Sequence, residues 1–205
     1  MEHFTYDNTF NEHSFSPLGL LVYRSAVCEG ISKFVKIVLD YLGVECMLVS
    51  GKATNNTIQR TELHMWNIVK ISGNPYHLDV TFDMSLRTRM KRYDYFNLSD
   101  SEIEKDHIIT SNAPKCIKSG KDYYSANSLV VFDFKEMRGL IKNQLKSGKR
   151  HLIFKLNNDE LNSRTDIVEE IIKIAIQQFQ RLYIRSVSVE VSYNPSQYIY
   201  EIKFT

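Results

Sequence analysis

The sequence predicts an α+β protein built in two parts. An amphipathic helix is followed by three strand-like segments with no further helix between them, which is typical of a helix packed on an antiparallel sheet. A later series in the order strand, helix, strand, helix, strand, strand predicts a smaller βαβαββ unit. The 205 residues, of which 43% are hydrophobic and 24% charged, suffice for a sizeable core.

The first helix is predicted over residues 28–42. Gly43 follows it directly, at the place where a glycine commonly ends a helix. Cys28 therefore stands in the first turn. The apolar residues recur at the i, i+3, i+4, i+7 spacing of one buried helix face, and they are Ile31, Phe34, Val35, Val38, Leu39 and Leu42.

Three strands are predicted after this helix. They are the segments "VECMLVSG" at residues 44–51, "ELHMWNIVKI" at 62–71 and "YHLDVTF" at 76–82. Residues 72–75, Ser-Gly-Asn-Pro, have the composition of a turn, so the last two strands are expected to form a hairpin. Further on, "SDSEIEKDH" at 99–107 predicts a capped short helix or a loop.

The second unit follows a segment rich in Ser, Gly and Lys at residues 118–128, which is the best candidate for a linker. We place one domain at residues 1–125 and an α+β accessory domain at 126–205. The elements predicted for the second domain are strands at 129–134, 151–156, 186–193 and 198–204 and helices at 135–148 and 166–182.

Charge and hydropathy exclude several classes of partner. The formal net charge of +2 is too small to indicate nucleic acid or an anionic membrane as a partner. We interpret the basic run of Arg87, Arg89, Lys91 and Arg92 as solvated surface, and we expect no nucleic-acid binding. No window reaches the roughly 18 apolar residues of a spanning helix, so no membrane span is expected.

The localisation prediction depends on whether the chain is full-length. Its start, "MEHFTYDNTFNEHSF", is polar and lacks the apolar region of a secretory signal. A full-length chain of this kind is expected to be cytoplasmic. For an excerpt of an exported protein, the localisation stays unknown.

Three cysteines are an odd number for a disulfide framework, so reduced thiols are expected. Cys46, in the apolar run "VECMLV", and Cys116, in a loop-like stretch, are interpreted as buried thiols. Cys28 differs because the free N–H groups and the dipole of a helix start favour the thiolate. Its position makes it a candidate nucleophile.

A nucleophilic thiol needs a histidine to share its proton and a carboxylate to orient that histidine. In the predicted hairpin, residues whose numbers sum to an odd total share a face. His64 and Asp79 therefore point the same way, as do His77 and Thr81.

The hairpin geometry leaves alternatives open. A strict two-residue turn at Gly73 and Asn74 pairs His64 with Asp83 and leaves Asp79 about four residues, on the order of 13 Å, along the strand. Pairing of His64 with Asp79 then demands an irregular turn. Asp83 stays open as a rival orienter, and His77 as a rival base.

Five segments together resemble a known family. "AVCEG", "GVECMLVSG", "HMWNIV", "YHLDVTFD" and "YFNLSDSEIEKDH" resemble, in order and spacing over residues 16–107, the bacterial form of the transglutaminase-like superfamily, which has the papain-related cysteine enzyme fold. The resemblance implies a helix bearing the cysteine packed on an antiparallel sheet. It implies Cys28 as nucleophile, His64 as general base and acid, and Asp79, in preference to Asp83, as the orienting carboxylate.

The chain departs from that family at two places. Phe82 stands where the family usually has tryptophan, which keeps an aromatic side chain. Family members generally carry helical sequence upstream of the position of Tyr6, and here almost none precedes it. The tail at residues 126–205 looks like an accessory unit of bacterial members.

Other residues near the candidate triad have two interpretations each. Trp66 lies two residues from His64 on the same strand face and either stacks on a substrate acyl chain or belongs to the core. Asn67 and Thr81 are candidate supporting donors, or structural residues. His77 and Asp79 lack a third ligand at a zinc-like spacing, so no metal and no cofactor is expected.

The sequence therefore predicts a cysteine-dependent acyl-transfer enzyme acting on amide bonds of peptides or proteins. Peptidase or amidase activity and transglutaminase-like activity share the first half of the reaction. The alternative is a non-catalytic module of the same fold that binds a protein or peptide. In either case the C-terminal unit is the candidate surface for a protein partner.

Overall fold

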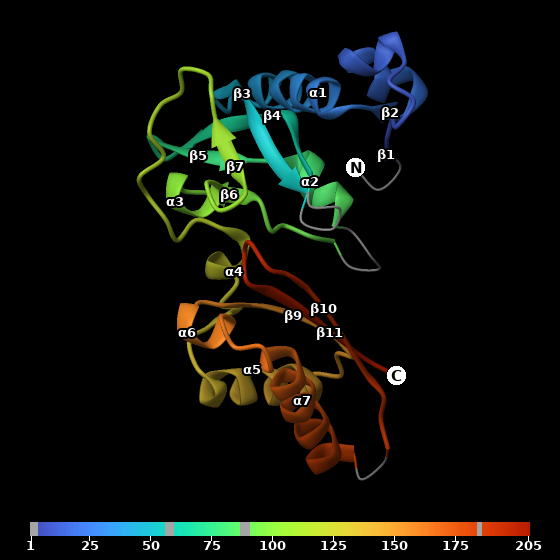
Figure 1. The fold of residues 1–205 in the computed structure, drawn as a ribbon, viewed down its shortest axis with the longest axis vertical. Helices are drawn as coiled ribbons and strands as arrows, with labels where there is room; N and C mark the ends of the chain where they lie inside the picture. The colour runs from blue at the N-terminus through green and yellow to red at the C-terminus, as the bar shows by residue number, and fades with distance from the viewer. Residues whose placement is uncertain (1–3, 56–59, 87–90, 184–185) are drawn as a thin grey trace. The chain divides into compact units, whose positions relative to one another are not determined.

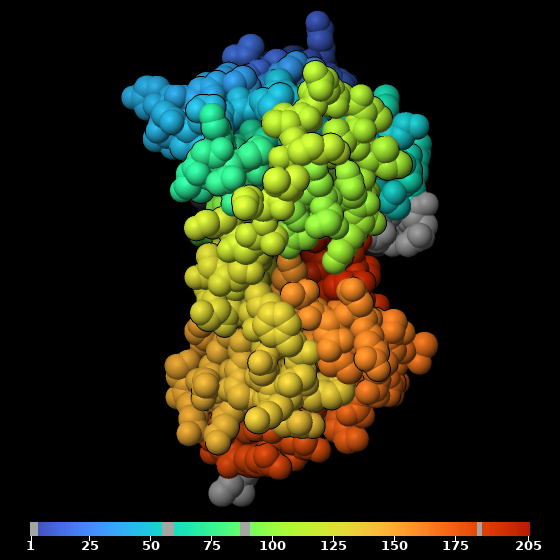
Figure 2. Space-filling model, turned by 90° about the vertical axis from the view of Figure 1, so that its left-hand side faces the viewer, coloured from blue at the N-terminus to red at the C-terminus, as the bar shows by residue number. Residues whose placement is uncertain are grey.

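The computed structural model describes residues 4–55, 60–86, 91–183 and 186–205. The chain divides into two compact units, residues 1–123 and 124–205 (Figure 1). The division falls inside the segment rich in Ser, Gly and Lys. In the space-filling view the first unit is coloured from blue to yellow-green and the second from yellow to red (Figure 2).

The first unit is organised around a five-stranded sheet in which every neighbouring pair is antiparallel. The strand order is β6-β5-β4-β3-β7. The strands are β3 (Cys46–Asn55), β4 (Arg60–Ile71), β5 (Asn74–Leu78), β6 (Phe96–Leu98) and β7 (His107–Ile109). The molecule is therefore mixed α+β, as predicted.

Helix α1 (Cys28–Tyr41) lies across one face of this sheet (Figure 1). Its buried side chains Ile31 and Val35 pack with Val69, Tyr76 and Leu78 of the sheet. The chain leaves the helix through Gly43 at a φ of 75°, a conformation that glycine adopts without strain. The helix predicted over residues 28–42 is thus present.

The segment before α1 folds back against the start of the helix. It contains β1 (Thr5–Tyr6), a 3₁₀ turn η1 (Glu12–Phe15), a π-helical turn η2 (Gly19–Tyr23) and β2 (Ser25–Ala26). β1 and β2 pair in parallel, with Tyr6 opposite Ala26. Tyr6 is therefore placed beside the residues that lead directly into Cys28.

The strand predicted over residues 76–82 is wrong in its second half. β5 ends at Leu78, and helix α2 (Val80–Ser85) begins after Asp79. The Asp79 side chain accepts a hydrogen bond from the Phe82 N–H at 3.1 Å, which is the capping bond of a helix N-terminus. A capped helix therefore forms here, although the alternating residues of "DVTF" are typical of a strand.

The hairpin turn also differs from the prediction. Ile71 pairs with Asn74, so the two turn residues are Ser72 and Gly73, with φ of 50° and 81°. Two positive φ values in a two-residue turn match the right-handed twist of the strands. The turn is regular, and the irregularity that was expected there lies instead where the chain leaves the sheet after Leu78.

Helix α3 (Asp100–Ile103) is short and carries a complete capping box. The Ser99 side chain and the Glu102 side chain each satisfy a backbone N–H of the other residue. This agrees with the capped helix expected within residues 99–107. The helix directly precedes β7, on which His107 lies.

The second unit has a four-stranded sheet in the order β10-β11-β9-β8, in which only β8 and β9 are parallel. Both long helices contribute to one core with this sheet. Its elements are α4 (Tyr123–Ala126), β8 (Val130–Val131), α5 (Phe134–Lys146), β9 (His151–Leu156), α6 (Asp159–Asn162), α7 (Ile167–Tyr183), β10 (Val189–Asn194) and β11 (Ile199–Phe204). This is the predicted βαβαββ order with short helices added.

Two further observations concern the partner predictions. Arg87 and Arg89 lie outside the described residues. Lys91 is exposed, but Arg92 is buried and its guanidinium lies 2.5 Å from the Asp94 carboxylate, so the interpretation of the run as solvated surface is wrong at Arg92. Within the described parts of the chain, none of the helices has the length and apolarity that crossing a bilayer requires.

Candidate active site

Cys28 is the first residue of α1 and is partly buried. Burial raises the pKa of its thiol, but three favourable interactions lower that pKa overall. These are a hydrogen bond with the His64 side chain, the positive charge of His64, and a hydrogen bond from the Met65 backbone N–H. The sulfur is thus surrounded by donors that favour the thiolate.

His64 lies on β4 and links the thiol to a buried acid. Its Nε2 atom is 2.6 Å from Oδ2 of Asp79. Nδ1 is then the ring nitrogen left for Cys28. Burial lowers the pKa of His64, but the charge and hydrogen bond of Asp79 and the interaction with Cys28 outweigh burial and raise it to about 10. The imidazolium form is favoured at neutral pH.

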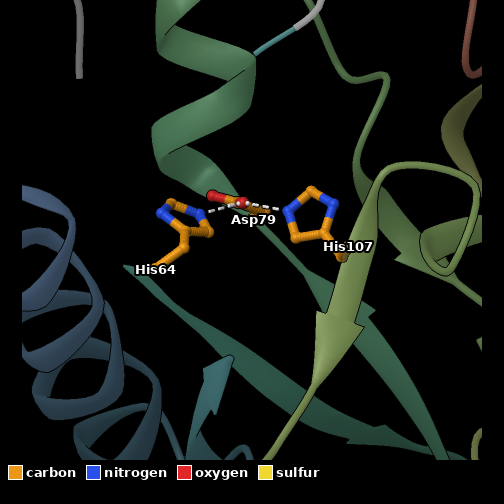
Figure 3. A group of neighbouring side chains, drawn as sticks. All are labelled: His64, Asp79 and His107. Atoms are coloured by element: carbon orange, nitrogen blue, oxygen red, sulfur yellow. Dashed lines mark hydrogen bonds and ion pairs between the residues drawn. The ribbon is translucent and has the colours of Figure 1, made fainter. Parts of the chain in front are cut away.

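Asp79 is completely buried and accepts hydrogen bonds at both oxygens. Oδ1 accepts the Phe82 N–H, and Oδ2 faces the Nε2 atoms of both His64 and His107 (Figure 3). Burial raises the pKa of this carboxyl, but the two histidines lower it below its usual range. Asp79 is therefore a carboxylate at neutral pH.

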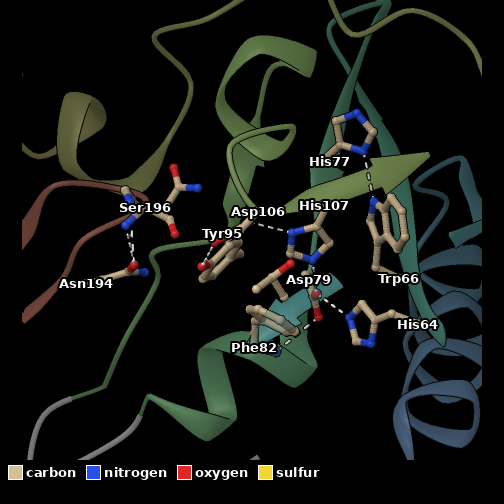
Figure 4. Close-up of polar contacts among 12 residues, drawn as sticks. His64, Trp66, His77, Asp79, Phe82, Tyr95, Asp106, His107, Asn194 and Ser196 are labelled. Carbon is tan, nitrogen blue, oxygen red and sulfur yellow. Dashed lines mark hydrogen bonds and ion pairs between the residues drawn. The ribbon is translucent and has the colours of Figure 1, made fainter. Parts of the chain in front are cut away.

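His107 continues the hydrogen-bonded chain beyond Asp79 (Figure 4). Its Nε2 is 3.0 Å from Asp79 Oδ2, and its Nδ1 is 2.6 Å from Asp106 Oδ1. The Tyr95 hydroxyl donates to Asp106 Oδ2 at 2.5 Å. His107 was not among the predicted site residues. It stands at the end of "SEIEKDH", and no pattern in that segment indicates a catalytic role.

The close approach of β7 to β3 brings His107 to the site. Gly51 of β3 lies opposite Ile109 of β7, and a Cβ atom at Gly51 would stand 2.0 Å from the Ile108 carbonyl oxygen. It would also stand 2.8 Å from the ring of Trp66. Only a residue without a side chain allows this packing.

Tyr6 is a second residue at the site that the sequence patterns did not indicate. Its phenol interacts with both the backbone and the thiol of Cys28. Burial and the negative charge of the neighbouring thiolate raise the pKa of Tyr6 to about 12. The phenol therefore stays protonated beside Cys28.

Neither Asp83 nor His77 takes the place that was considered for it beside His64 or Cys28. Asp83 is half-buried and accepts the Tyr95 N–H at 2.9 Å, and desolvation of its carboxyl together with the charge of Asp94 raises its pKa well above the usual range. His77 accepts the Trp66 Nε1–H at 2.9 Å and faces Asp100 at 2.9 Å through Nε2. Burial lowers the pKa of His77, so it is a neutral residue within the packed structure.

Trp66, Asn67 and Thr81, which were considered as substrate-binding or supporting residues, lie in different surroundings. Trp66 is fully buried, and its ring stacks at 5.9 Å on that of His64, so it packs behind the histidine. Asn67 donates to the Ser32 carbonyl at 3.1 Å and thereby ties β4 to α1. The Thr81 hydroxyl is buried in α2, and among the described residues it has no hydrogen-bond partner.

Two groups of described residues have ligand atoms close enough to hold a metal ion. In the group His64, Asp79 and His107, every facing atom already takes part in a hydrogen bond. In the group His77, Asp100 and Cys116, burial raises the pKa of the thiol to about 12, the opposite of what a thiolate ligand requires. In both groups, hydrogen bonds between the side chains explain why the possible ligand atoms lie so close together.

Comparisons with known proteins give a structural likeness. No family model matches the chain, and no curated protein matches it. A solved structure described as "Crystal structure of a TGase" is similar. It is 17% identical to this chain, with a TM-score of 0.35, and the match covers 43% of this chain and 25% of that chain. The chain thus spans about a quarter of that protein's length.

Proposed function

We propose that this chain is a cysteine-dependent acyl-transfer enzyme that acts on amide bonds of peptides or proteins. In this proposal Cys28 is the nucleophile, His64 the general acid and base, and Asp79 the carboxylate that orients His64. The enzyme is a peptidase or amidase, or a transglutaminase-like enzyme, according to the group that accepts the acyl chain.

One observation carries the proposal. A single histidine, His64, interacts with the helix-start thiol of Cys28 and with the buried carboxylate of Asp79. The pKa of the thiol is lowered and that of the imidazole is raised, which describes a thiolate and imidazolium pair. A purely structural cysteine needs neither shift.

The first half of the proposed reaction forms a thioester. The Cys28 sulfur donates its electron pair to the carbonyl carbon, and the carbonyl π electrons move to oxygen. When the intermediate collapses, the carbon–nitrogen bond breaks and Nδ1–H of His64 protonates the departing amine. The amine leaves with that proton, and His64 becomes neutral.

The second half returns the enzyme to its starting state. Water or an amine attacks the thioester and gives a proton to the neutral His64, and the carbon–sulfur bond breaks to restore the thiolate. The Cys28 backbone N–H is the proposed donor to the carbonyl oxygen. Because the Tyr6 phenol interacts with the backbone of Cys28, the substrate oxygen has to compete with it there.

We further propose that residues 1–125 form a transglutaminase-like catalytic domain and residues 126–205 an accessory domain. The helix on an antiparallel sheet, with the cysteine at the helix start, supports this assignment. The accessory domain is the proposed surface for a protein partner.

Capture of the acyl enzyme tests the proposal. The protein is incubated with a tryptic digest of casein and methylamine, quenched in acid, and analysed by intact-mass and peptide mass spectrometry. We expect an acyl adduct on Cys28 and hydrolysed or methylamine-modified peptides, with neither product in Cys28→Ala. Folded wild-type protein that binds these peptides and leaves them unchanged would instead identify a binding module.

A further inference from the structure

The two ring nitrogens of His107 each face a carboxylate oxygen. Nε2 lies 3.0 Å from Asp79 Oδ2, and Nδ1 lies 2.6 Å from Asp106 Oδ1. A carboxylate oxygen only accepts hydrogen bonds, so both nitrogens have to be donors to satisfy both contacts. A histidine with two N–H donors carries a positive charge.

The other oxygens of these two carboxylates also face donors. Asp79 Oδ1 accepts the Phe82 N–H at 3.1 Å, and Asp106 Oδ2 accepts the Tyr95 hydroxyl at 2.5 Å. Donors at both of its oxygens favour the ionised form of Asp79. The proton between these groups is therefore placed on His107.

Three aromatic rings pack around His107. The ring of Phe82 lies at 4.6 Å, that of Trp66 at 5.1 Å and that of Tyr95 at 5.6 Å from the His107 ring. His107 is itself completely buried.

We propose that His107 is a positively charged positioning residue, which holds Asp79 against His64 and shares the negative charge of Asp79. The hydrogen bond fixes Oδ2 between the two histidines (Figure 3). The charge also limits how strongly Asp79 holds the proton on His64. The proposal rests on the proposed function only where it gives His64 a part in proton transfer.

Several titratable groups of the described residues influence the charge of His107. Asp79 and Asp106 bind it directly, His64 lies at 5.5 Å between ring centres, and the Tyr95 phenol completes the chain. The positive charge of His107 contributes to lowering the pKa of the neighbouring His77, which is neutral. Burial lowers the pKa of His107, but the two carboxylates raise it overall, in agreement with the donor count.

Substitution His107→Gln distinguishes charge sharing from mere packing. Loss of the positive charge favours protonation of the neighbouring groups. The titration midpoints of the Cys28 thiol and of the His64 imidazole should therefore both move to higher pH. A shift of about one to two pH units is expected for His64 at this separation. If His107 only supports the packing, loosening should instead raise the thiol midpoint toward ~8.5 and lower the imidazole midpoint toward ~6.5.

The two midpoints are measured separately. Iodoacetamide labelling of Cys28 across pH gives the thiol midpoint, and ¹⁵N NMR of the histidine rings gives that of His64. His77→Gln is the matched control, because His77 is equally buried and bonded to an acid but has no contact with Asp79. It should leave both midpoints unchanged.

A second measurement needs no variant. In the wild-type protein the ¹⁵N shifts of His107 should be those of an imidazolium between pH 5 and pH 9. A neutral ring in this range, or opposite shifts of the two midpoints in His107→Gln, overturns the proposal. Shifts as expected in a protein that cleaves no amide would retain the charge sharing and reject the enzymatic function.

Discussion

The Nε2 atom of His64 lies 2.6 Å from Oδ2 of Asp79 because the chain leaves the sheet directly after Leu78. Register alone places Leu78 opposite Asn67, three residues along β4 from His64. Asp79 turns out of the sheet to cap α2, and its carboxylate then reaches the histidine. The capping bond and the contact with His64 use different oxygens of one side chain.

Asp79→Asn and Asp83→Asn form a matched pair of variants of two acids at the start of α2. The pKa of Asp79 is lowered, so its charge stabilises the fold above the usual carboxyl pKa, and this contribution is lost as the pH falls through the lowered value. Asp79→Asn should cost about 3 kcal/mol of unfolding free energy at pH 7, because two histidines lose their counter-charge.

Asp83→Asn should behave oppositely. The pKa of Asp83 is raised, so the folded protein loses stability as the pH rises from the usual carboxyl pKa toward the raised value. The amide keeps the acceptor for the Tyr95 N–H and removes this cost, so stability at pH 7 should be unchanged or higher. Urea unfolding at pH 4 and pH 7 measures both variants. Equal losses at pH 7 would refute the assignment of charge.

Tyr6→Phe tests the contact between the phenol and the thiolate. The variant loses the hydroxyl that interacts with the Cys28 thiol, so the titration midpoint of that thiol should rise by about one pH unit. Labelling with iodoacetamide across pH gives the midpoint. Tyr41→Phe is the control, since Tyr41 is exposed at the far end of α1. An unchanged midpoint in Tyr6→Phe would show that the hydroxyl does not bind the thiolate in solution.

Gly51→Ala should damage the site through packing. The added methyl group meets the Ile108 carbonyl oxygen, so β7 has to move, and we expect a loss of about 1–3 kcal/mol in unfolding free energy. Displacement of β7 should also slow Cys28 labelling. Gly139→Ala is the control, because its methyl group meets no atom within 4 Å in helix α5 and should stabilise by about 0.5–1 kcal/mol. Equal stability of the Gly51 variant and the wild type would contradict this packing.

The elements that the sequence predicted best depend on local patterns. The apolar stripe from Ile31 to Leu42 and the glycine after it define α1, and Ser99 with Glu102 defines the cap of α3. Such signals lie within a few residues of one another, so no knowledge of the tertiary structure is needed.

The remaining features depend either on competition between two local patterns or on contacts between residues that lie far apart in the sequence. At Asp79 a strand pattern and a helix cap overlap, and only the packed structure decides between them. Tyr6 and His107 reach the site through the pairing of β1 with β2 and of β7 with β3. No local pattern in the sequence records those pairings.

The most direct test of the account is the pH dependence of alkylation at each thiol. Folded protein is treated with iodoacetamide from pH 5 to pH 9, and labelling is resolved by mass spectrometry. Cys46 and Cys116 serve as internal controls, because burial raises the pKa of both.

Cys28 should react much faster than these controls at mildly acidic pH, where a thiol of pKa ~8.5 is almost fully protonated. His64→Ala should remove most of the advantage, and Asp79→Ala should reduce it less, because the carboxylate orients His64 without taking the proton. A Cys28 rate that equals the controls, or that is indifferent to His64→Ala, would contradict the proposed thiolate and imidazolium pair.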